Sequence, residues 1–227
     1  MSRATKPKTF YWIAGVFSLI AIATWLTFLS MAQADPEIQH VEVQEYQGEK
    51  LGSVGDFREN SILGVQHIDQ QSYELVIDGL VVTPSSFSYA ELQTMPHIAK
   101  LVTLNCVEGW SVRALWEGIA LPELLALAQP TETANSVIFH AADGYTTSLP
   151  MDFVWERNLI IADHINGIQL PPARGFPFQL IAEDKWGYKW IRWLTRIELS
   201  NDPDYRGFWE SRGFSNDADT DGPRFGN

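Results

Sequence analysis

Hydrophobic and polar positions divide the chain into an apolar N-terminal stretch, a polar segment and a long region of short apolar runs. Residues 10–31 carry no charge, and residues 35–55 are polar with three glycines. From residue 56 on, short apolar runs alternate with turn residues, a pattern typical of strands with a few short helices. Because no strand–helix–strand rhythm is present, we expect a mixed, mainly β fold of the α+β class.

Several of the apolar runs predict strands. Residues 73–79 alternate between apolar and polar side chains and end in Asp-Gly, which predicts a strand followed by a turn. The other strands are predicted from short β-prone runs. They cover residues 100–104, 136–140, 179–182 and 190–199.

Three short helices are predicted between these strands. The first covers residues 87–94, because Ser88 can cap it and Glu91 stands three residues later, as in a capping box. The second covers residues 122–128 and begins with a proline, which the first turn of a helix tolerates. Residues 151–157 form the third predicted helix.

The apolar N-terminal stretch predicts a transmembrane anchor or a signal sequence. As a helix, its 22 residues would extend about 33 Å, sufficient to cross the hydrocarbon core of a bilayer. Three basic residues precede it and acidic residues follow it, so the positive-inside rule places the domain outside the cytoplasm, on the periplasmic side. The length favours a retained anchor. The run Ala32-Gln33-Ala34 leaves a cleaved signal and a secreted soluble form as the alternative.

These patterns predict three parts of the chain. Residues 1–34 form the anchor or signal, residues 35–55 a linker, and residues 56–227 one functional domain.

The charge of the chain limits which classes of partner that domain can bind. Thirteen basic and 28 acidic residues follow residue 34, giving this part a formal charge of −15. Such an acidic surface repels phosphate groups, so we expect no nucleic-acid partner.

Cys106 is the only cysteine of the chain, so an intramolecular disulfide is excluded. It follows a predicted strand and enters a turn that contains Gly109 and Trp110. A thiolate in such a turn can be a soft ligand for a transition metal or a nucleophile. A free cysteine is also often a small buried apolar residue, and the residue alone leaves these alternatives open.

Three motifs around and after this cysteine resemble one family. Asn105 to Ser111, followed by Trp116 and Gly118, is similar to the metal-binding segment of sulfite-oxidase-type molybdopterin oxidoreductases. Gly187 to Trp190 with Leu194 to Leu199 resembles the second signature of that family. Gly207 to Glu210 with Gly213 and Phe214 resembles a third. The resemblance covers roughly residues 56 to 225, and its nearest branch contains the catalytic subunits of periplasmic protein-methionine-sulfoxide reductases.

The resemblance implies a sulfite-oxidase-like fold and a molybdenum ion held by Cys106 and by the dithiolene of a pyranopterin. Tungsten in place of molybdenum is not excluded. Gly187, Tyr188 and Lys189 match positions that bind the pterin phosphate, a role that suits N–H donors and a cation. Further cofactor contacts are implied at Asn60, Ala141, Arg174 and Gln179.

Three of these positions depart from the family pattern. Ala141 falls where a relative has threonine, so only its backbone could contact the cofactor. Arg174 replaces a histidine or asparagine, and Gln179 replaces an arginine. A positive charge has therefore moved by a few residues along the chain.

The sequence after Cys106 indicates the reaction. Sulfite oxidases follow their cysteine with an Ala-Gly-Asn-Arg-type sequence, whereas this chain has Val107 to Trp110. A rim with glutamate and little arginine suits sulfite dianion badly, so we expect removal of an oxygen atom from an uncharged sulfoxide or N-oxide, such as methionine sulfoxide. The alternatives are a sulfite-oxidising enzyme and a cofactor-free, membrane-anchored binding module on the same fold.

The same resemblance implies an external electron donor. The chain has no haem-attachment motif and too few cysteines for an iron–sulfur cluster. We therefore expect electrons to arrive from a separate membrane protein that carries haem or oxidises quinol.

Overall fold

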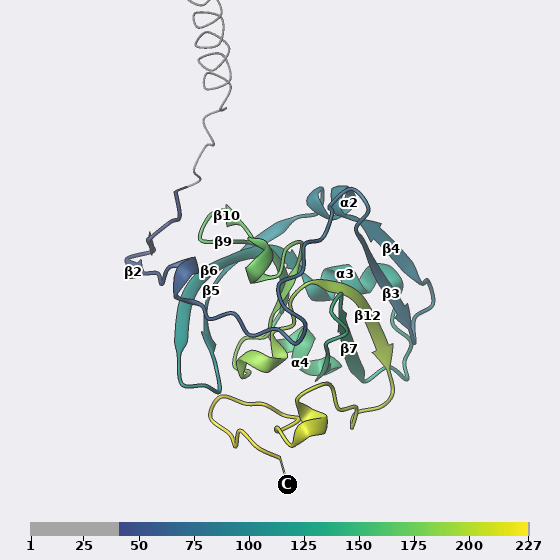
Figure 1. The fold of residues 1–227 in the computed structure, drawn as a ribbon. Helices are drawn as coiled ribbons and strands as arrows, with labels where there is room; N and C mark the ends of the chain where they lie inside the picture. The colour runs from purple at the N-terminus through teal and green to yellow at the C-terminus, as the bar shows by residue number, and fades with distance from the viewer. Residues whose placement is uncertain (1–40, 227) are drawn as a thin grey trace, which may run out of the picture. The chain divides into compact units, whose positions relative to one another are not determined.

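Two five-stranded sheets form the framework of residues 41–226, the part of the chain that the computed structural model describes (Figure 1). The predicted N-terminal anchor or signal lies outside these residues. Within residues 41–226, no helix has the length and apolar character needed to cross a membrane. The predicted mixed, mainly β architecture is confirmed for this part of the chain.

The first sheet is antiparallel and has the order β10-β9-β6-β5, with β11 also paired to β9. Its strands β5 and β6 form a long hairpin in which Asn105 pairs with Ser111. The turn of this hairpin therefore consists of residues 106–110. The strands are β5 (His97–Asn105), β6 (Ser111–Ala120), β9 (Ile160–Ile165), β10 (Ile168–Gln169) and β11 (Gln179–Ile181).

The second sheet has the order β4-β3-β12-β7-β8. Its central strand β12 runs parallel to β3 and antiparallel to β7. A parallel pair needs a long crossover, and here the connection from β3 to β12 includes the whole first sheet. The strands are β3 (Glu74–Gly79), β4 (Ser85–Ser88), β7 (Ser136–Ala141), β8 (Thr146–Pro150) and β12 (Leu194–Ser200).

The three predicted helices are confirmed. Helix α2 (Tyr89–Gln93) begins with the predicted capping box, in which the Glu91 amide donates to the Ser88 hydroxyl and the Ser88 amide donates to the Glu91 carboxylate. Helix α3 (Leu121–Ala128) carries its proline in the first turn, and α4 (Met151–Glu156) covers the third predicted range. Short 3₁₀ turns occur at Val54–Asp56, Pro172–Arg174, Gly187–Lys189 and Glu210–Arg212.

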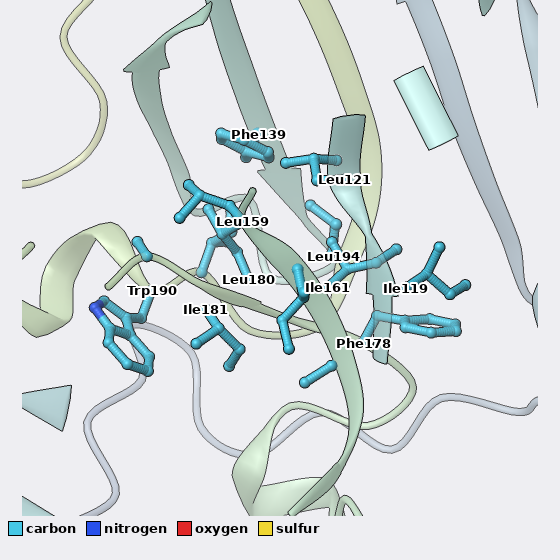
Figure 2. Close-up of a cluster of buried hydrophobic side chains, with 14 of the residues drawn as sticks. Ile119, Leu121, Phe139, Leu159, Ile161, Phe178, Leu180, Ile181, Trp190 and Leu194 are labelled. Carbon is cyan, nitrogen blue, oxygen red and sulfur yellow. The ribbon is translucent and has the colours of Figure 1, made fainter. Parts of the chain in front are cut away.

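Apolar side chains from both sheets meet in one buried core. Figure 2 shows Ile119, Ile161 and Leu180 of the first sheet close to Phe139 and Leu194 of the second. Full burial of each such side chain stabilises the fold by about 1.5–3 kcal/mol relative to exposure. The core therefore fixes the two sheets against each other and gives the loops at their edges a rigid base.

The structure differs from the predicted strands at the start of β12 and in strands that were not predicted, which are β4, β6, β8, β9 and β10. Strand β12 begins at Leu194 instead of Trp190, because residues 187–189 form a 3₁₀ turn and Trp193 has a positive φ of 53°. Strand β6 is the longest of the unpredicted strands. It lies inside the sheet with both faces largely buried, so its side chains do not show the alternation that marks a half-exposed strand.

The stretch predicted to be a linker also differs from expectation. It contains the small hairpin of β1 (Glu45–Tyr46) and β2 (Glu49–Lys50). The Asn166 side chain donates to the Glu42 carboxylate over 2.7 Å and to the Gly52 carbonyl over 2.9 Å, and the Gly52 amide donates to the Arg113 carbonyl. From Val41 on, these residues therefore belong to the same folded unit as the sheets.

Candidate cofactor site

A cavity of about 560 Å³ opens at the turn between β5 and β6. This volume is in the range of cofactor and small-molecule pockets, and the walls are rich in aromatic side chains, as in such pockets. Four segments that are distant in sequence supply most of the lining. They are residues 57–64, residues 104–110, residues 174–193 and the C-terminal residues Trp209 and Phe214.

Cys106 is at the start of the turn and contributes its half-buried side chain to the cavity wall. The Cys106 amide donates to the Trp110 carbonyl over 2.9 Å, and the Gly109 amide donates to the Cys106 carbonyl over 3.0 Å. Gly109 has a φ of 89°, a conformation that glycine adopts without strain. The Asn60 side-chain amide lies 4.0 Å from the Cys106 sulfur. The structure therefore brings two of the predicted site residues together.

The surroundings of Cys106 favour a protonated thiol in the metal-free protein. Burial raises the pKa of the Cys106 thiol above its ordinary value, while a hydrogen bond from the Glu108 main chain and the charges of Arg58 and Arg224 act in the opposite direction. A bound metal ion overcomes such a shift, because coordination deprotonates a thiol outright. Cys106 is thus suited to be a metal ligand more than a free nucleophile.

Three arginines line the cavity, two of which, Arg58 and Arg192, sequence reasoning did not assign to the site. Arg174 and Arg192 both contact the carboxylate of Glu59. The pKa of Arg174 is lowered to about 10, chiefly by burial and also by the charge of Arg192, while Glu59 opposes the shift. The expectation of an arginine-poor rim was therefore wrong for the cavity as a whole, because it considered only the residues that directly follow Cys106.

Lys189 does not contribute to the cavity wall. Its side chain is fully buried, and its ammonium lies 2.7 Å from the Glu210 carboxylate and 2.9 Å from the Ser148 carbonyl. Burial lowers the pKa of Lys189, and the paired Glu210 opposes this shift. This geometry gives no support to the phosphate-binding role expected of Lys189, since its charge is already compensated inside the protein.

Gly187 and Tyr188 do line the cavity. A Cβ atom on Gly187 would lie 3.2 Å from a methyl group of Leu104 and 3.7 Å from the Cys106 Cα. The absence of a side chain thus lets this segment approach the cysteine closely. The Tyr188 hydroxyl donates to the Ser215 carbonyl over 2.8 Å, which ties the same segment to the C-terminal region.

Of the two remaining predicted cofactor contacts, one lines the cavity and the other does not. Gln179 lines the cavity from the start of β11. Ala141 does not line it, and its amide and carbonyl bond to Tyr145 and Gly144 in the turn that follows β7. Two other residues of this turn, Asp143 and Tyr145, reach the cavity instead.

The C-terminal segment, drawn in yellow in Figure 1, contributes Trp209 and Phe214 to the cavity wall. The Arg224 guanidinium donates to the Val107 carbonyl over 3.1 Å and lies 4.7 Å from the centre of the Trp186 ring. Lys185 forms an ion pair with Asp219 over 2.5 Å. The motif from Gly207 to Phe214 indicated that this segment belongs to the site, whereas no local sequence motif predicts the contact made by Arg224.

The residues present fit a metal that brings most of its own ligands. Within residues 41–226, no group of three or more histidine, cysteine or acidic side chains is placed to hold a metal ion. A metal at Cys106 would therefore be bound by the Cys106 sulfur and would take its other ligands from a cofactor. The cavity has the volume for a bulky group of that kind, and its arginines are suited to a phosphate.

A cavity of about 560 Å³ with a single thiol in its wall has the size and chemistry of a cofactor pocket. Residues 62–209 match the family described as the oxidoreductase molybdopterin binding domain, and the chain belongs to this family. The resemblance inferred from the three motifs is thereby confirmed.

Two relatives and one solved structure extend the comparison. The chain is 32% identical over 148 residues to the uncharacterized oxidoreductase YuiH of Bacillus subtilis, covering 64% of this chain and 74% of that protein. It is 30% identical over 151 residues to the putative protein-methionine-sulfoxide reductase subunit YedZ1 of Azospira oryzae, covering 66% of this chain and 57% of that protein. The sulfane dehydrogenase SoxCD from Paracoccus pantotrophus has a similar fold, with a TM-score of 0.59, 23% identity, and coverage of 61% of this chain and 41% of that chain. The sulfite-oxidase-like fold is therefore confirmed.

Proposed function

We propose that this protein is a molybdenum–pyranopterin oxidoreductase that removes an oxygen atom from a sulfoxide or an N-oxide. The observation that carries the proposal is the Cys106 sulfur at the wall of a cofactor-sized cavity, within a molybdopterin-binding domain. When bound, the cofactor supplies the two-electron redox chemistry that the reaction needs. Tungsten in the place of molybdenum would leave this proposal unchanged.

The protein's own residues would hold and orient that cofactor. Cys106 would supply a thiolate to the metal, and Asn60 would direct its amide toward the sulfur. Arg58, Arg174 and Arg192 are the cations of the cavity wall, and arginine forks bind phosphate through paired N–H donors. Among residues 41–226, Arg58 is the one of these three without a carboxylate within 4.0 Å, so it matches the phosphate-binding role better than Lys189, which is paired with Glu210.

The charge balance of the cavity supports an uncharged substrate. Its three arginines are accompanied by three carboxylates, those of Glu59, Glu108 and Asp143. Glu59 is neutralised by Arg174 and Arg192, and a phosphate on the cofactor would use Arg58, so Glu108 and Asp143 would repel an anionic substrate. Trp209 and Phe214 give the same cavity an aromatic side, and thioether sulfur contacts aromatic rings favourably. An uncharged sulfoxide such as methionine sulfoxide fits the charge balance, and its thioether product fits the aromatic side.

The reaction consumes electrons that this domain would have to receive. Breaking the S=O bond takes up two electrons and two protons, and it releases a sulfide and water. We propose a separate membrane protein, carrying haem or oxidising quinol, as the electron donor. The apolar residues 10–31 would hold the domain beside it, on the outer side of the membrane. Protease added to spheroplasts should then digest the domain, whereas protection would reverse this orientation.

One observation favours a second candidate, sulfite oxidation. Arg58 lines the cavity, and within residues 41–226 no carboxylate lies within 4.0 Å of its guanidinium nitrogens. Such a cation could attract sulfite, provided that the cofactor phosphate does not occupy it. The two candidates differ in substrate charge and in the direction of electron flow, so one set of assays separates them.

The test uses the full chain, purified from a host that makes the cofactor. We expect about one molybdenum per chain and the reduction of a sulfoxide by a reduced dye. Cys106→Ser should contain little metal, because a hydroxyl is a hard and weakly acidic ligand. Oxidation of sulfite without sulfoxide reduction would favour the second candidate. A folded wild-type protein without molybdenum or tungsten would instead indicate a cofactor-free binding module.

A further inference from the structure

The cavity wall formed by residues 57–64 has no secondary structure of its own. It belongs to no strand or 3₁₀ turn, and within the described part of the chain none of its backbone groups forms a main-chain hydrogen bond. Loop segments without such bonds open easily unless side chains hold them. The position of this wall, and with it the position of Asn60, therefore depends on side-chain contacts.

Two arginines from elsewhere in the chain supply these contacts. Arg192 donates to the Asn60 carbonyl over 2.5 Å, to the Ala173 carbonyl over 2.9 Å, and to the Glu59 carboxylate. Arg174 lies 3.3 Å from the same carboxylate and 3.5 Å from the Arg58 carbonyl. Three successive residues of the wall are thus bound by two guanidinium groups.

The single carboxylate of Glu59 makes this arrangement stable. The Arg174 and Arg192 side chains are 8% and 13% exposed, so both cations are largely removed from water. Two neighbouring buried cations repel each other and are costly unless an anion compensates them. In the described part of the chain, Glu59 is the one carboxylate within 4.0 Å of either guanidinium group.

We propose that Glu59, Arg174 and Arg192 are positioning residues that hold the wall of residues 57–64 closed over the site. By fixing the Asn60 backbone they place the Asn60 amide 4.0 Å from the Cys106 sulfur. The inference rests on the proposed function, in which Cys106 is a metal ligand. Partners of metal ligands typically change metal affinity by about 10–100-fold when they are lost.

The planar shape of the Arg192 side chain is needed for its positioning role. Arg192 reaches three acceptors in different directions from one planar group. A lysine carries the same charge on a compact ammonium and cannot reproduce that fork. Arg192→Lys therefore separates the geometric role from the charge, and Glu59→Gln removes the charge with little change in shape.

Two readouts test the proposal. The first is the rate at which iodoacetamide alkylates the full chain produced without cofactor, which reports on Cys106 alone because the chain has no other thiol. Glu59→Gln and Arg192→Lys should each raise this rate severalfold. The second is the visible absorption and metal retention of the loaded protein, which should change in both variants, with metal lost at least about tenfold faster during dialysis.

Asp78→Asn is the matched control. It removes the carboxylate that binds Arg196 through two contacts of 2.9 Å between β3 and β12, away from the cavity. We expect both readouts to keep their wild-type values in this variant. Wild-type alkylation rates in Glu59→Gln and Arg192→Lys would overturn the proposal, as would an equal rise in the control. Absence of metal from the wild-type protein would reject the proposed function alone, because the alkylation assay does not need the cofactor.

Discussion

The buried pair of Lys189 and Glu210 offers a sharp test of the site description. Both side chains are 0% exposed, and the ammonium lies 2.7 Å from one carboxylate oxygen. The other oxygen, Oε2, has no hydrogen-bond partner in residues 41–226. Lys189→Met would remove the cation and leave Glu210 with only the hydroxyl of Thr147, 2.5 Å away. An uncompensated buried charge of this kind costs about 3–5 kcal/mol.

This cost should appear in thermal unfolding. A domain of this size loses about 2–4 °C in Tm for each kcal/mol, so Lys189→Met should melt roughly 6–20 °C below the wild type. Circular dichroism of the full chain measures this shift. The double variant Lys189→Met with Glu210→Gln should recover most of the loss, because removing both charges of a buried pair is often neutral. Lys50→Met, at an exposed position in β2, should change stability by less than about 0.5 kcal/mol.

The same experiment distinguishes the structural role of Lys189 from phosphate binding. If the lysine served mainly the cofactor, Lys189→Met would keep its Tm and lose molybdenum. That result, or a wild-type Tm in the single variant, would refute the reasoning. A loss of stability that Glu210→Gln repairs would confirm it.

Three further predictions address the metal ligand, a strand contact and the pH dependence of stability. Cys106→Ser should abolish turnover and metal content while circular dichroism stays unchanged; wild-type turnover would make the cysteine a packing residue. Gly118→Ala should cost about 1–3 kcal/mol in urea unfolding, because its Cβ would lie 2.0 Å from the Ile161 carbonyl oxygen; an unchanged midpoint would contradict the strand register. Burial raises the pKa of Asp163, but hydrogen bonds, chiefly that from His164, outweigh it and lower the pKa below its ordinary 3.8. The bond to Asp163 in turn raises the pKa of His164 above 6.5. The carboxylate stabilises the fold above pH about 4 and the imidazolium does so below pH about 6.5, and each contribution is lost as the pH passes the folded-state pKa. The destabilisation caused by Asp163→Asn should therefore be largest between these values and shrink outside them, and a difference that does not vary with pH would exclude this linkage.

Features encoded by neighbouring residues could be predicted from the sequence. The capping box of α2 needs only Ser88 and Glu91, which stand three positions apart. Cys106 and Gly187 were found because each lies within a compact motif, and the structure places both at the cavity. In these cases the physical cause and the sequence signal occupy the same few residues.

Features that depend on distant partners could not be predicted in this way. Arg192 acquires its role from Glu59, which is 133 positions away, so neither residue carries a local signal. Lys189 lies in a motif that resembles a phosphate-binding segment, but its side chain pairs with Glu210 on another segment. Strand β6 shows no regular alternation of apolar and polar residues, because it lies between β5 and β9 and both of its faces are largely buried.

The contribution of the C-terminal segment has a consequence for synthesis of the protein on the ribosome. A nascent chain that has emerged only as far as Trp190 already contains Cys106, yet it lacks β12, the centre of the second sheet. It also lacks Arg192 and Arg224, which fix the two sides of the cavity. Strand β3 pairs with β12, which lies more than 100 residues downstream, and such non-local pairing forms late. Under the proposed function, the cofactor would therefore bind only after residue 224 has been translated, and chains released before that point would remain empty.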